Sequence, residues 1–501
     1  IPIMPVVGPV DLGEVLPAWT NPLPSYASPF SHLLERAEAG YYAVTLLRYD
    51  VEAELTATVR AGFHRYRFPA AGAASVVIDV TRDLKGYQTG EVTIIDATTV
   101  TGSSQTTGPE HTIHFAARFD RPFVTRATFA GTTVSDGSSH AAGAAVGAVL
   151  GFGDAPGVVQ VKVGISYVDV AGALANLDAE VPGWDFAAVR GAARAAWNEK
   201  LGAIEVEGGT LADRRSFYTA LYHAELFPNV FSDVDGRYRG FDDAIRIGDR
   251  IQYTQFSLWD SYRGQNQLLA VLEPAEYRDM IESLMNDWRQ SGSLPRWALA
   301  NRAPNYMSGD PVIPFIGEAW CRGLIEEEAK EEIFGAMREA VERRPATYLA
   351  SGFDPTPRPA NPIAVVEGGP RNAGTTLEYG IAEFSLALMA DEVGRTADRD
   401  ALSARALNYR NLLDPETRWI RPRHDDGSWL EAFLPENGYG FQEGTSWQYS
   451  WLAMQDLRGL FDRMGGNDEV NRRLDVLFGF PLTATVPVVH PKLQNTITVF
   501  G

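Results

Sequence analysis

The hydrophobic pattern of this chain changes its period near residue 180, and few folds accommodate such a change. Before that point apolar residues alternate with polar ones, as over 51–59. Clusters of Gly, Ser, Thr and Asp, as over 101–107 and 135–143, separate the runs and are expected to form turns. From about residue 184 apolar residues recur at helical spacing, in stripes over 277–288, 377–388 and 447–454. Alternation with frequent turns predicts an antiparallel β-sandwich, and the longer period predicts amphipathic helices. We therefore expect an α+β protein, with an N-terminal antiparallel β-sandwich followed by a helical array of the (α/α) barrel type.

The same pattern predicts how the chain is divided. Residues 1–180 are expected to form the sandwich domain, 181–205 a connecting helix, and 206–501 the helical barrel. The chain opens Ile-Pro-Ile without a Met and closes on a strand-like run over 496–501. A natural terminus seldom ends on an unpaired apolar edge. We therefore expect the sandwich to be incomplete at its N-terminus and the barrel to be incomplete at its C-terminus.

Composition excludes several classes of function. The chain has 44 Lys and Arg against 64 Asp and Glu, a net charge of −20, which would repel nucleic acid and anionic membranes. No apolar run approaches the roughly 20 residues that span a bilayer. Cys321 is the only cysteine, which excludes an intrachain disulfide, a zinc-binding cysteine cluster and a dithiol redox pair.

Several catalytic signatures are also missing from the sequence. The 8 histidines show no metal-binding spacing, and there is no nucleophile elbow, phosphate-binding loop or dinucleotide fingerprint. What remains is carboxylate chemistry on a neutral substrate rich in hydroxyl groups. Glycoside hydrolysis is the natural candidate for such chemistry.

The motif densest in aromatic and charged residues is Ser257–Arg263. The indole face of Trp259 can stack on the apolar face of a sugar, while Asp260 and Arg263 can bind its hydroxyls through charged hydrogen bonds. The alternative is structural: Trp259 belongs to the core, and Asp260 with Arg263 forms a surface ion pair on a helix.

A second motif, Asn305–Asp310, places the carboxylate of Asp310 just before a helix expected to begin near Pro311. Asp310 is therefore a candidate site residue in a loop. An Asp before a Pro is also a common helix N-cap, so capping of that helix is the alternative.

A third motif, Gly440–Tyr449, places Glu443 between a loop and the first turn of an aromatic-rich helix. A carboxyl partly shielded by indole and phenol rings is expected to have a raised pKa, as a general acid needs at neutral pH. The alternative is again a capping carboxylate at the helix N-terminus.

These motifs, in this order, resemble glycoside hydrolase family 92, the exo-acting α-mannosidases. The resemblance covers nearly the whole chain. It is carried by Ser28–His32, Gly40–Tyr42, Glu54–Thr58, Tyr218–Asp242, Phe256–Arg263, Gly292–Trp297, Met307–Asp310, Thr376–Tyr379, Asn408–Asp414, Glu443–Tyr449, Gly465–Gly466 and Leu474–Asp475.

The resemblance implies a secreted enzyme with a β-sandwich packed on an (α/α)6 barrel, acting on terminal α-linked mannose, as in N-glycan processing. It implies hydrolysis with inversion, assisted by one calcium ion. By motif, Glu443 corresponds to the general acid, and Trp259 and Asp260 correspond to sugar contacts of the −1 subsite. The same resemblance points to further substrate contacts at Arg263, Asp310, Trp447 and Gln448.

The sequence departs from the family pattern in two ways. The Gly- and Pro-rich opening segment is missing, and so is the later segment that supplies calcium ligands and the general base. The calcium ligands and the base are therefore expected to lie outside these 501 residues. In addition, Gln442 precedes Glu443 where the family often has a small or apolar residue.

The second departure leaves other functions open. If Gln442 rather than Glu443 faces the glycosidic oxygen, only a good leaving group would react, as in a mannosyl-phosphodiester hydrolase. A protein that binds mannose without turnover is another alternative. A sugar phosphorylase is the last alternative function, and it rests on analogy of fold alone. The sequence gives no prediction of linkage preference or oligomeric state.

Overall fold

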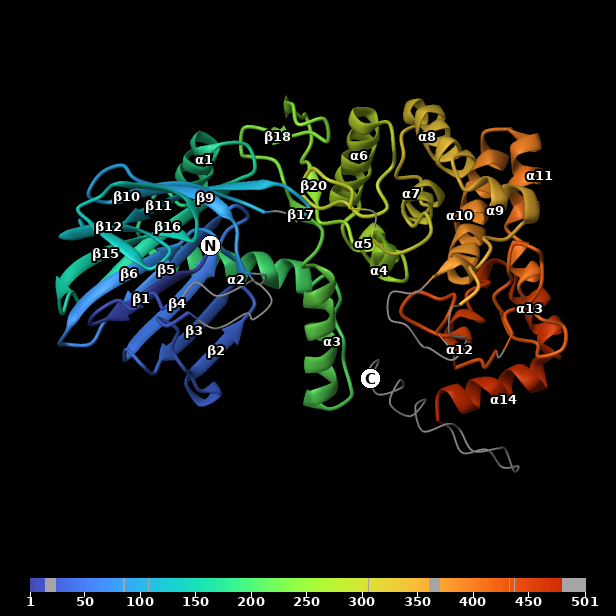
Figure 1. The fold of residues 1–501 in the computed structure, drawn as a ribbon, viewed down its shortest axis with the longest axis horizontal. Coiled ribbons are helices and arrows are strands. Elements are labelled where there is room, and N and C mark those ends of the chain that lie inside the picture. The colour runs from blue at the N-terminus through green and yellow to red at the C-terminus, as the bar shows by residue number, and fades with distance from the viewer. Residues whose placement is uncertain are drawn as a thin grey trace. The chain divides into compact units, whose positions relative to one another are not determined.

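The computed structural model describes residues 1–13, 24–83, 86–106, 108–304, 306–359, 370–431, 433–436 and 438–479 (Figure 1). The chain divides into two compact units. Unit 1 comprises Ile1–Phe256 with Ala298–Pro304, and unit 2 comprises Ser257–Trp297 with Asn305–Gly501.

The strands lie in unit 1. They are β1 (Ile3–Val7), β2 (Glu35–Glu38), β3 (Tyr41–Leu46), β4 (Val51–Ala57), β5 (Ala61–Arg67), β6 (Ala73–Asp79), β7 (Arg82–Asp83), β8 (Gly86–Tyr87), β9 (Thr89–Ile94), β10 (Thr99–Gln105), β11 (Thr112–Phe119), β12 (Thr125–Ala130), β13 (Thr133–Asp136), β14 (His140–Ala144), β15 (Val146–Asp154), β16 (Val158–Ser166), β17 (Asn229–Val230), β18 (Arg237–Arg239), β19 (Ile245–Ile247) and β20 (Tyr253–Thr254).

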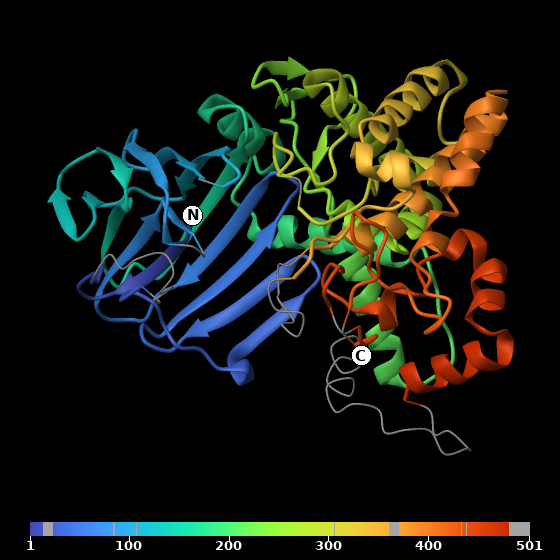
Figure 2. The same ribbon diagram turned by 45° about the vertical axis from the view of Figure 1, so that its right-hand side comes forward.

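Two antiparallel sheets of these described strands form the predicted sandwich. One sheet has the order β1-β6-β15-β12-β13, and the other has the order β14-β9-β10-β11-β16-β5-β4-β3-β2. The turned view in Figure 2 shows the blue strands of the second sheet side by side. Buried residues from both sheets, among them Val76, Leu150, Val51 and Phe115, pack into one hydrophobic core. The prediction of an N-terminal antiparallel sandwich is therefore confirmed.

Alternation explains why these segments are strands. In β4, Val51 and Ala53 are buried while Glu52 between them is exposed. Two of the clusters predicted to separate strands lie partly within strands. The run over 101–107 lies largely in β10, and the run over 135–143 overlaps β13 and β14. Polar β-branched and small residues fit a pleated strand as well as a turn, so composition does not separate the two. Residue 107 lies outside the described residues.

The helices of the described residues follow strand β16. They are α1 (Val170–Glu180), α2 (Phe186–Leu201), α3 (Leu211–Ala224), α4 (Leu258–Ser261), α5 (Gln265–Leu272), α6 (Pro274–Ser291), α7 (Val312–Cys321), α8 (Lys330–Glu342), α9 (Ala346–Ser351), α10 (Asn372–Glu392), α11 (Thr396–Arg405), α12 (Ser446–Tyr449), α13 (Leu457–Met464) and α14 (Asn467–Leu477), with short 3-10 turns at His32–Leu34, Glu327–Ala329, Asn408–Asn411 and Met454–Asp456. Among the described helices, none combines the length and the apolar character needed to cross a membrane.

The connecting helix belongs to the sandwich unit. Helix α2 is capped by Asp185, whose carboxylate accepts a hydrogen bond from Ala188 N at 3.0 Å. Its first residue, Phe186, packs with Phe63 and Leu177 in a second buried cluster of unit 1. The compact units divide the chain after Phe256. The predicted domain bounds, with a connecting helix over 181–205, stay a prediction.

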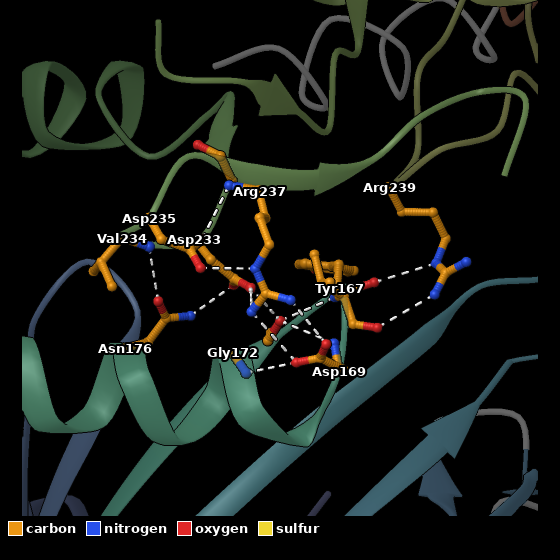
Figure 3. Close-up of polar contacts among 12 residues, drawn as sticks. Tyr167, Asp169, Gly172, Asn176, Asp233, Val234, Asp235, Arg237 and Arg239 are labelled. Atoms are coloured by element: carbon orange, nitrogen blue, oxygen red, sulfur yellow. Dashed lines mark hydrogen bonds and ion pairs between the residues drawn. The ribbon is translucent and has the colours of Figure 1, made fainter. Parts of the chain in front are cut away.

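A buried polar network joins helix α1 to the loop before strand β18 (Figure 3). Asp233 accepts hydrogen bonds from Asn176 Nδ2 at 2.7 Å and from Ser166 Oγ at 2.8 Å. Asn176 Oδ1 in turn accepts one from the backbone N–H of Val234 at 2.8 Å. Burial raises the pKa of Asp233, and these hydrogen bonds act against that rise. Asn176 therefore satisfies the buried carboxylate of Asp233 and the backbone N–H of Val234.

Arg237 extends this network toward the start of the helix. Its guanidinium donates to Asp169, the N-cap of α1, at 2.8 Å and to Asp235 at 2.7 Å. Arg239 donates to the carbonyl of Tyr167 at 3.4 Å. Together these contacts hold β18 and its preceding loop against α1, as Figure 3 shows.

We expect Asn176→Ala to lower the free energy of unfolding by about 1–3 kcal/mol, because it removes one of the two side-chain hydrogen bonds to the buried Asp233 carboxylate and the acceptor of the Val234 N–H. Urea unfolding measures this change. The control is Asn198→Ala on the exposed side of α2, expected to stay within about 0.5 kcal/mol of the wild type. Equal effects of the two substitutions would contradict this account of the network.

Unit 2 is helical, as predicted. In α6 the residues Tyr277, Ile281 and Leu284 are buried on one face, which confirms that stripe. Helix α10 packs against α7, α8 and α11 and is buried nearly all round. Its predicted stripe holds only in part, since Phe384 and Leu388 are exposed. The third predicted stripe, over 447–454, is wrong because α12 ends at Tyr449.

Candidate active site

The first motif forms the short helix α4, with Ser257 at its N-cap position. The Ser257 hydroxyl donates a hydrogen bond to the carboxylate of Asp260, which is exposed. Trp259 is only 6% exposed and lies in the hydrophobic core of unit 2 with Leu377 and Tyr449. This placement corresponds to the structural alternative for Trp259, because a buried indole presents little open face for a sugar to stack on.

Arg263 does not pair with Asp260. Its Nη2 donates to Glu378 Oε1 at 2.5 Å, and its Nε donates to the carbonyl of Trp259 at 3.1 Å. The guanidinium also lies over the Trp259 ring, 4.6 Å from its centroid. The predicted surface ion pair on one helix is therefore wrong, because Glu378 from α10 offers a buried charge that needs a cation more than the exposed Asp260 does.

Glu378 is a site residue to which the sequence analysis gave no role. It is 3% exposed and accepts a second hydrogen bond, from Tyr262 Oη at 2.6 Å. Burial raises the pKa of Glu378, while Arg263 and Tyr262 lower it. The available signal was a Glu inside an otherwise small and apolar helical run over 372–382, where a charge needs a partner.

The second motif is held against Glu378. The backbone of Gly309 approaches so closely that a Cβ there would lie 2.5 Å from the Glu378 Cβ. Arg296 Nε donates to the carbonyl of Gly309 at 2.6 Å, and Arg371 Nη1 donates to that of Met307 at 2.9 Å. The loop is thus positioned by backbone contacts, which demand glycine at 309.

Asp310 is bound by an arginine and caps no helix through its side chain. Helix α7 has Pro311 at its N-cap position and no side-chain cap. Asp310 Oδ2 instead accepts a hydrogen bond from Arg344 Nε at 2.8 Å. Arg344 also pairs with the buried Glu383 at 2.6 Å. The capping alternative is therefore wrong, and Asp310 is engaged by a cation from within its own unit.

The third motif presents Glu443 on the surface of unit 2. Glu443 is exposed and has a left-handed backbone, with φ of 49°. Gln442 is half-buried, and its backbone carbonyl accepts a hydrogen bond from Tyr449 Oη at 2.7 Å. The sequence analysis expected aromatic rings to shield the Glu443 carboxyl. Within unit 2 that carboxyl is exposed instead.

Trp447 and Gln448 have structural contacts. The Trp447 ring lies against Trp419, with centroids 4.5 Å apart. Gln448 Oε1 accepts a hydrogen bond from the backbone N–H of Thr445 at 2.7 Å and completes a capping box at the start of α12. The alternative role considered for Glu443 was to cap the N-terminus of this helix. Thr445 and Gln448 supply that cap instead.

Tyr449 marks where two of the motifs meet. Burial raises its pKa, and the negative charges of Glu378 and Glu443 act in the same direction, while the positive charge of Arg263 opposes them. The 257–263 turn, helix α10 and the 440–449 loop therefore converge around this phenol. Asp310 is also linked to helix α10. Arg344 pairs with both Asp310 and Glu383, and Glu383 lies about one turn after Glu378 in that helix.

The residues of this site do not by themselves hold a calcium ion. In the described ranges no three His, Cys, Asp or Glu side chains come together as metal ligands would. Calcium prefers six to eight oxygen ligands, usually including several carboxylates. The residues present do not fit that requirement, and the chemistry below is derived without a step through the metal.

Comparison with known proteins places these features in one family. Residues 172–497 match "Glycosyl hydrolase family 92 catalytic domain", and residues 1–166 match "Glycosyl hydrolase family 92 N-terminal domain". The structure is similar to a family GH92 α-mannosidase from Bacteroides thetaiotaomicron in complex with mannoimidazole, with TM-score 0.86 and 27% identity, covering 97% of this chain and 65% of that one. It is also similar to a family GH92 inverting mannosidase from the same organism, with TM-score 0.84 and 26% identity, covering 99% and 67%.

A curated relative is more distant in sequence. It is an "uncharacterized secreted glycosidase" of Arthroderma benhamiae, 22% identical over 507 residues, which cover 88% of this chain and 60% of that protein. The chain therefore spans about two thirds or less of the length of these three relatives.

The two domain matches meet between residues 166 and 172, where the sandwich gives way to helices. The catalytic-domain match alone covers more than half of the chain. The motif order in the sequence, the sandwich-then-helices architecture and the solved relatives all agree. The chain belongs to glycosyl hydrolase family 92.

Proposed function

We propose that the protein is an exo-α-mannosidase that hydrolyses terminal α-linked mannose with inversion. The observation that carries this proposal is the family match. Two solved relatives support it, because one is an α-mannosidase and the other an inverting mannosidase. We extend the proposal to a secreted protein acting on mannose-containing glycans such as N-glycans, because the curated relative is called a secreted glycosidase.

Glu443 is the proposed proton donor to the glycosidic oxygen. Its carboxyl is exposed on a loop whose backbone is fixed, so a substrate can reach it. Asp260 is a second exposed carboxylate, at the turn that packs next to Tyr449 through Trp259. We assign Asp260 to sugar hydroxyls, and Arg263 to holding the turn through Glu378.

The proposed reaction is a single displacement. As the bond from the anomeric carbon to the leaving oxygen breaks, Glu443 transfers its proton to that oxygen. A water molecule attacks the anomeric carbon from the opposite face, and a base takes its proton. In inverting enzymes that base lies about 6.5–9.5 Å from the acid. We assign no described residue to this role.

A mannosyl-phosphodiester hydrolase is the second candidate, motivated by Gln442. Of the two side chains, Gln442 is half-buried and Glu443 is exposed, which supports Glu443 as the group that meets the substrate. The test compares the complete gene product on an α-linked mannobiose and on a mannose-1-phosphodiester. We expect mannose release from both. Release from the phosphodiester alone would favour the second candidate, and binding without any release would favour a mannose-binding protein.

We also propose that calcium supports the activity, as membership in this family implies. We expect EDTA to abolish mannose release by the complete gene product, and added calcium to restore it. Magnesium at the same concentration is the control, since its smaller octahedral coordination shell makes it a poor substitute. Full activity after exhaustive chelation would contradict the calcium requirement.

A further inference from the structure

A hydrogen bond from a buried side chain holds the peptide that leads into Glu443. Tyr449 Oη donates to the carbonyl oxygen of Gln442 at 2.7 Å. That carbonyl belongs to the 442–443 peptide, whose plane sets the φ angle of Glu443. The observed φ of 49° is unfavourable for a residue with a side chain, and such a conformation persists only where the surroundings impose it.

The phenol that makes this bond is itself immobile. Tyr449 is buried, and its ring lies 5.1 Å from that of Phe441. The backbones of Gly374 and Gly444 enclose the ring, because a Cβ at either position would come within 3.0 Å of it. Burial raises the pKa of Tyr449, so the hydroxyl stays protonated and remains a donor.

Loss of this bond would release the peptide. Without it, φ of residue 443 can change together with the backbone dihedral angles on both sides of residue 443, so that the loop around Glu443 rearranges. Glu443 would then relax to an ordinary negative φ, and its Cα–Cβ bond would point elsewhere. The direction of the carboxyl therefore depends on one hydroxyl group that does not itself touch the carboxyl.

From this geometry we infer that Tyr449 is a positioning residue, which aims the Glu443 carboxyl at the leaving-group oxygen by locking the 442–443 peptide. The inference rests on the proposed function of Glu443 as proton donor. It goes beyond that proposal by naming the group that sets the donor's direction. Tyr449→Phe removes the hydroxyl and keeps the ring.

The test uses two α-mannosides that differ in their need for a proton. Hydrolysis of an α-mannobiose requires protonation of a poor leaving group, whereas 2,4-dinitrophenyl α-mannoside has a leaving group that departs as an anion. We expect Tyr449→Phe to lower kcat on the mannobiose by about 10–100-fold with KM little changed. On the activated substrate we expect a loss of less than about threefold.

Tyr277→Phe is the matched control. Tyr277 Oη also donates to a backbone carbonyl, that of Phe315, at 2.9 Å, and its ring is also buried in unit 2. This variant should lose a similar amount of thermal stability without separating the two substrates. If Tyr449→Phe slows both substrates equally, slows neither, or lowers Tm far more than Tyr277→Phe does, the positioning role is wrong.

Glu443→Gln, measured in parallel, keeps the two proposals distinct. If Glu443→Gln separates the substrates and Tyr449→Phe does not, the positioning role alone fails. If Glu443→Gln fails to separate them, the proton-donor role itself fails. In the double variant, activity on the mannobiose should fall no further than in Glu443→Gln alone, because Tyr449 is inferred to act through Glu443.

Discussion

Replacing Glu443 with glutamine is expected to reduce kcat on an unactivated α-mannoside by about 10²–10⁴-fold, the usual contribution of a general acid. Glutamine keeps the shape of the side chain and cannot transfer a proton to the leaving oxygen. The left-handed backbone at this position and the Tyr449 hydrogen bond are retained, so the loop should stay in place. Steady-state kinetics on a mannobiose measure the loss.

The control for this substitution is Glu416→Gln, an exposed glutamate elsewhere in unit 2. We expect it to leave kcat unchanged. A Glu443→Gln variant with wild-type kcat on the mannobiose would remove Glu443 from the chemistry, and the proton donor would have to be sought at another carboxyl.

Replacing Arg344 with alanine is expected to lower the free energy of unfolding by about 3–5 kcal/mol. The Arg344 side chain is 2% exposed and lies between Asp310 at 2.8 Å and Glu383 at 2.6 Å. It also covers the ring of Tyr379, 4.0 Å from its centroid. Removal of Arg344 takes one of two cations from the fully buried Glu383, which keeps Arg405 at 2.9 Å, and the loop that carries Asp310 loses its tether.

The neighbouring Arg343 is a matched control. Its side chain is 54% exposed and pairs with Glu339 one helical turn away. We expect Arg343→Ala to cost no more than about 1 kcal/mol, because water screens such a pair. Urea unfolding followed by tryptophan fluorescence measures both variants. Similar losses at 343 and 344 would mean that burial of the ion pair has no energetic consequence here.

The broad fold could be predicted from the sequence because period and polarity report burial directly. Alternation in β4 and the stripe in α6 each correspond to a buried face. The predictions failed where the same composition is compatible with both a turn and a strand. The polar run over 101–107 lies largely in β10, where neighbouring strands satisfy its backbone groups.

The candidate site was less predictable because its contacts join residues far apart in the chain. Arg263 and Glu378 are separated by 115 residues, and the local spacing pointed instead to Asp260 as the partner. Nothing in the residues around Tyr449 shows that its hydroxyl reaches back to Gln442. Motif order named the candidate segments, and only the fold shows which of their side chains lie in the core, which cap a helix and which are exposed carboxylates.

The most direct test of the proposed activity is the anomer that the complete gene product releases first. Proton NMR during hydrolysis of an α-mannobiose distinguishes α-mannose from β-mannose before mutarotation mixes them. The single displacement proposed above predicts that β-mannose appears first. Initial release of α-mannose, or no release of mannose at all, would contradict it.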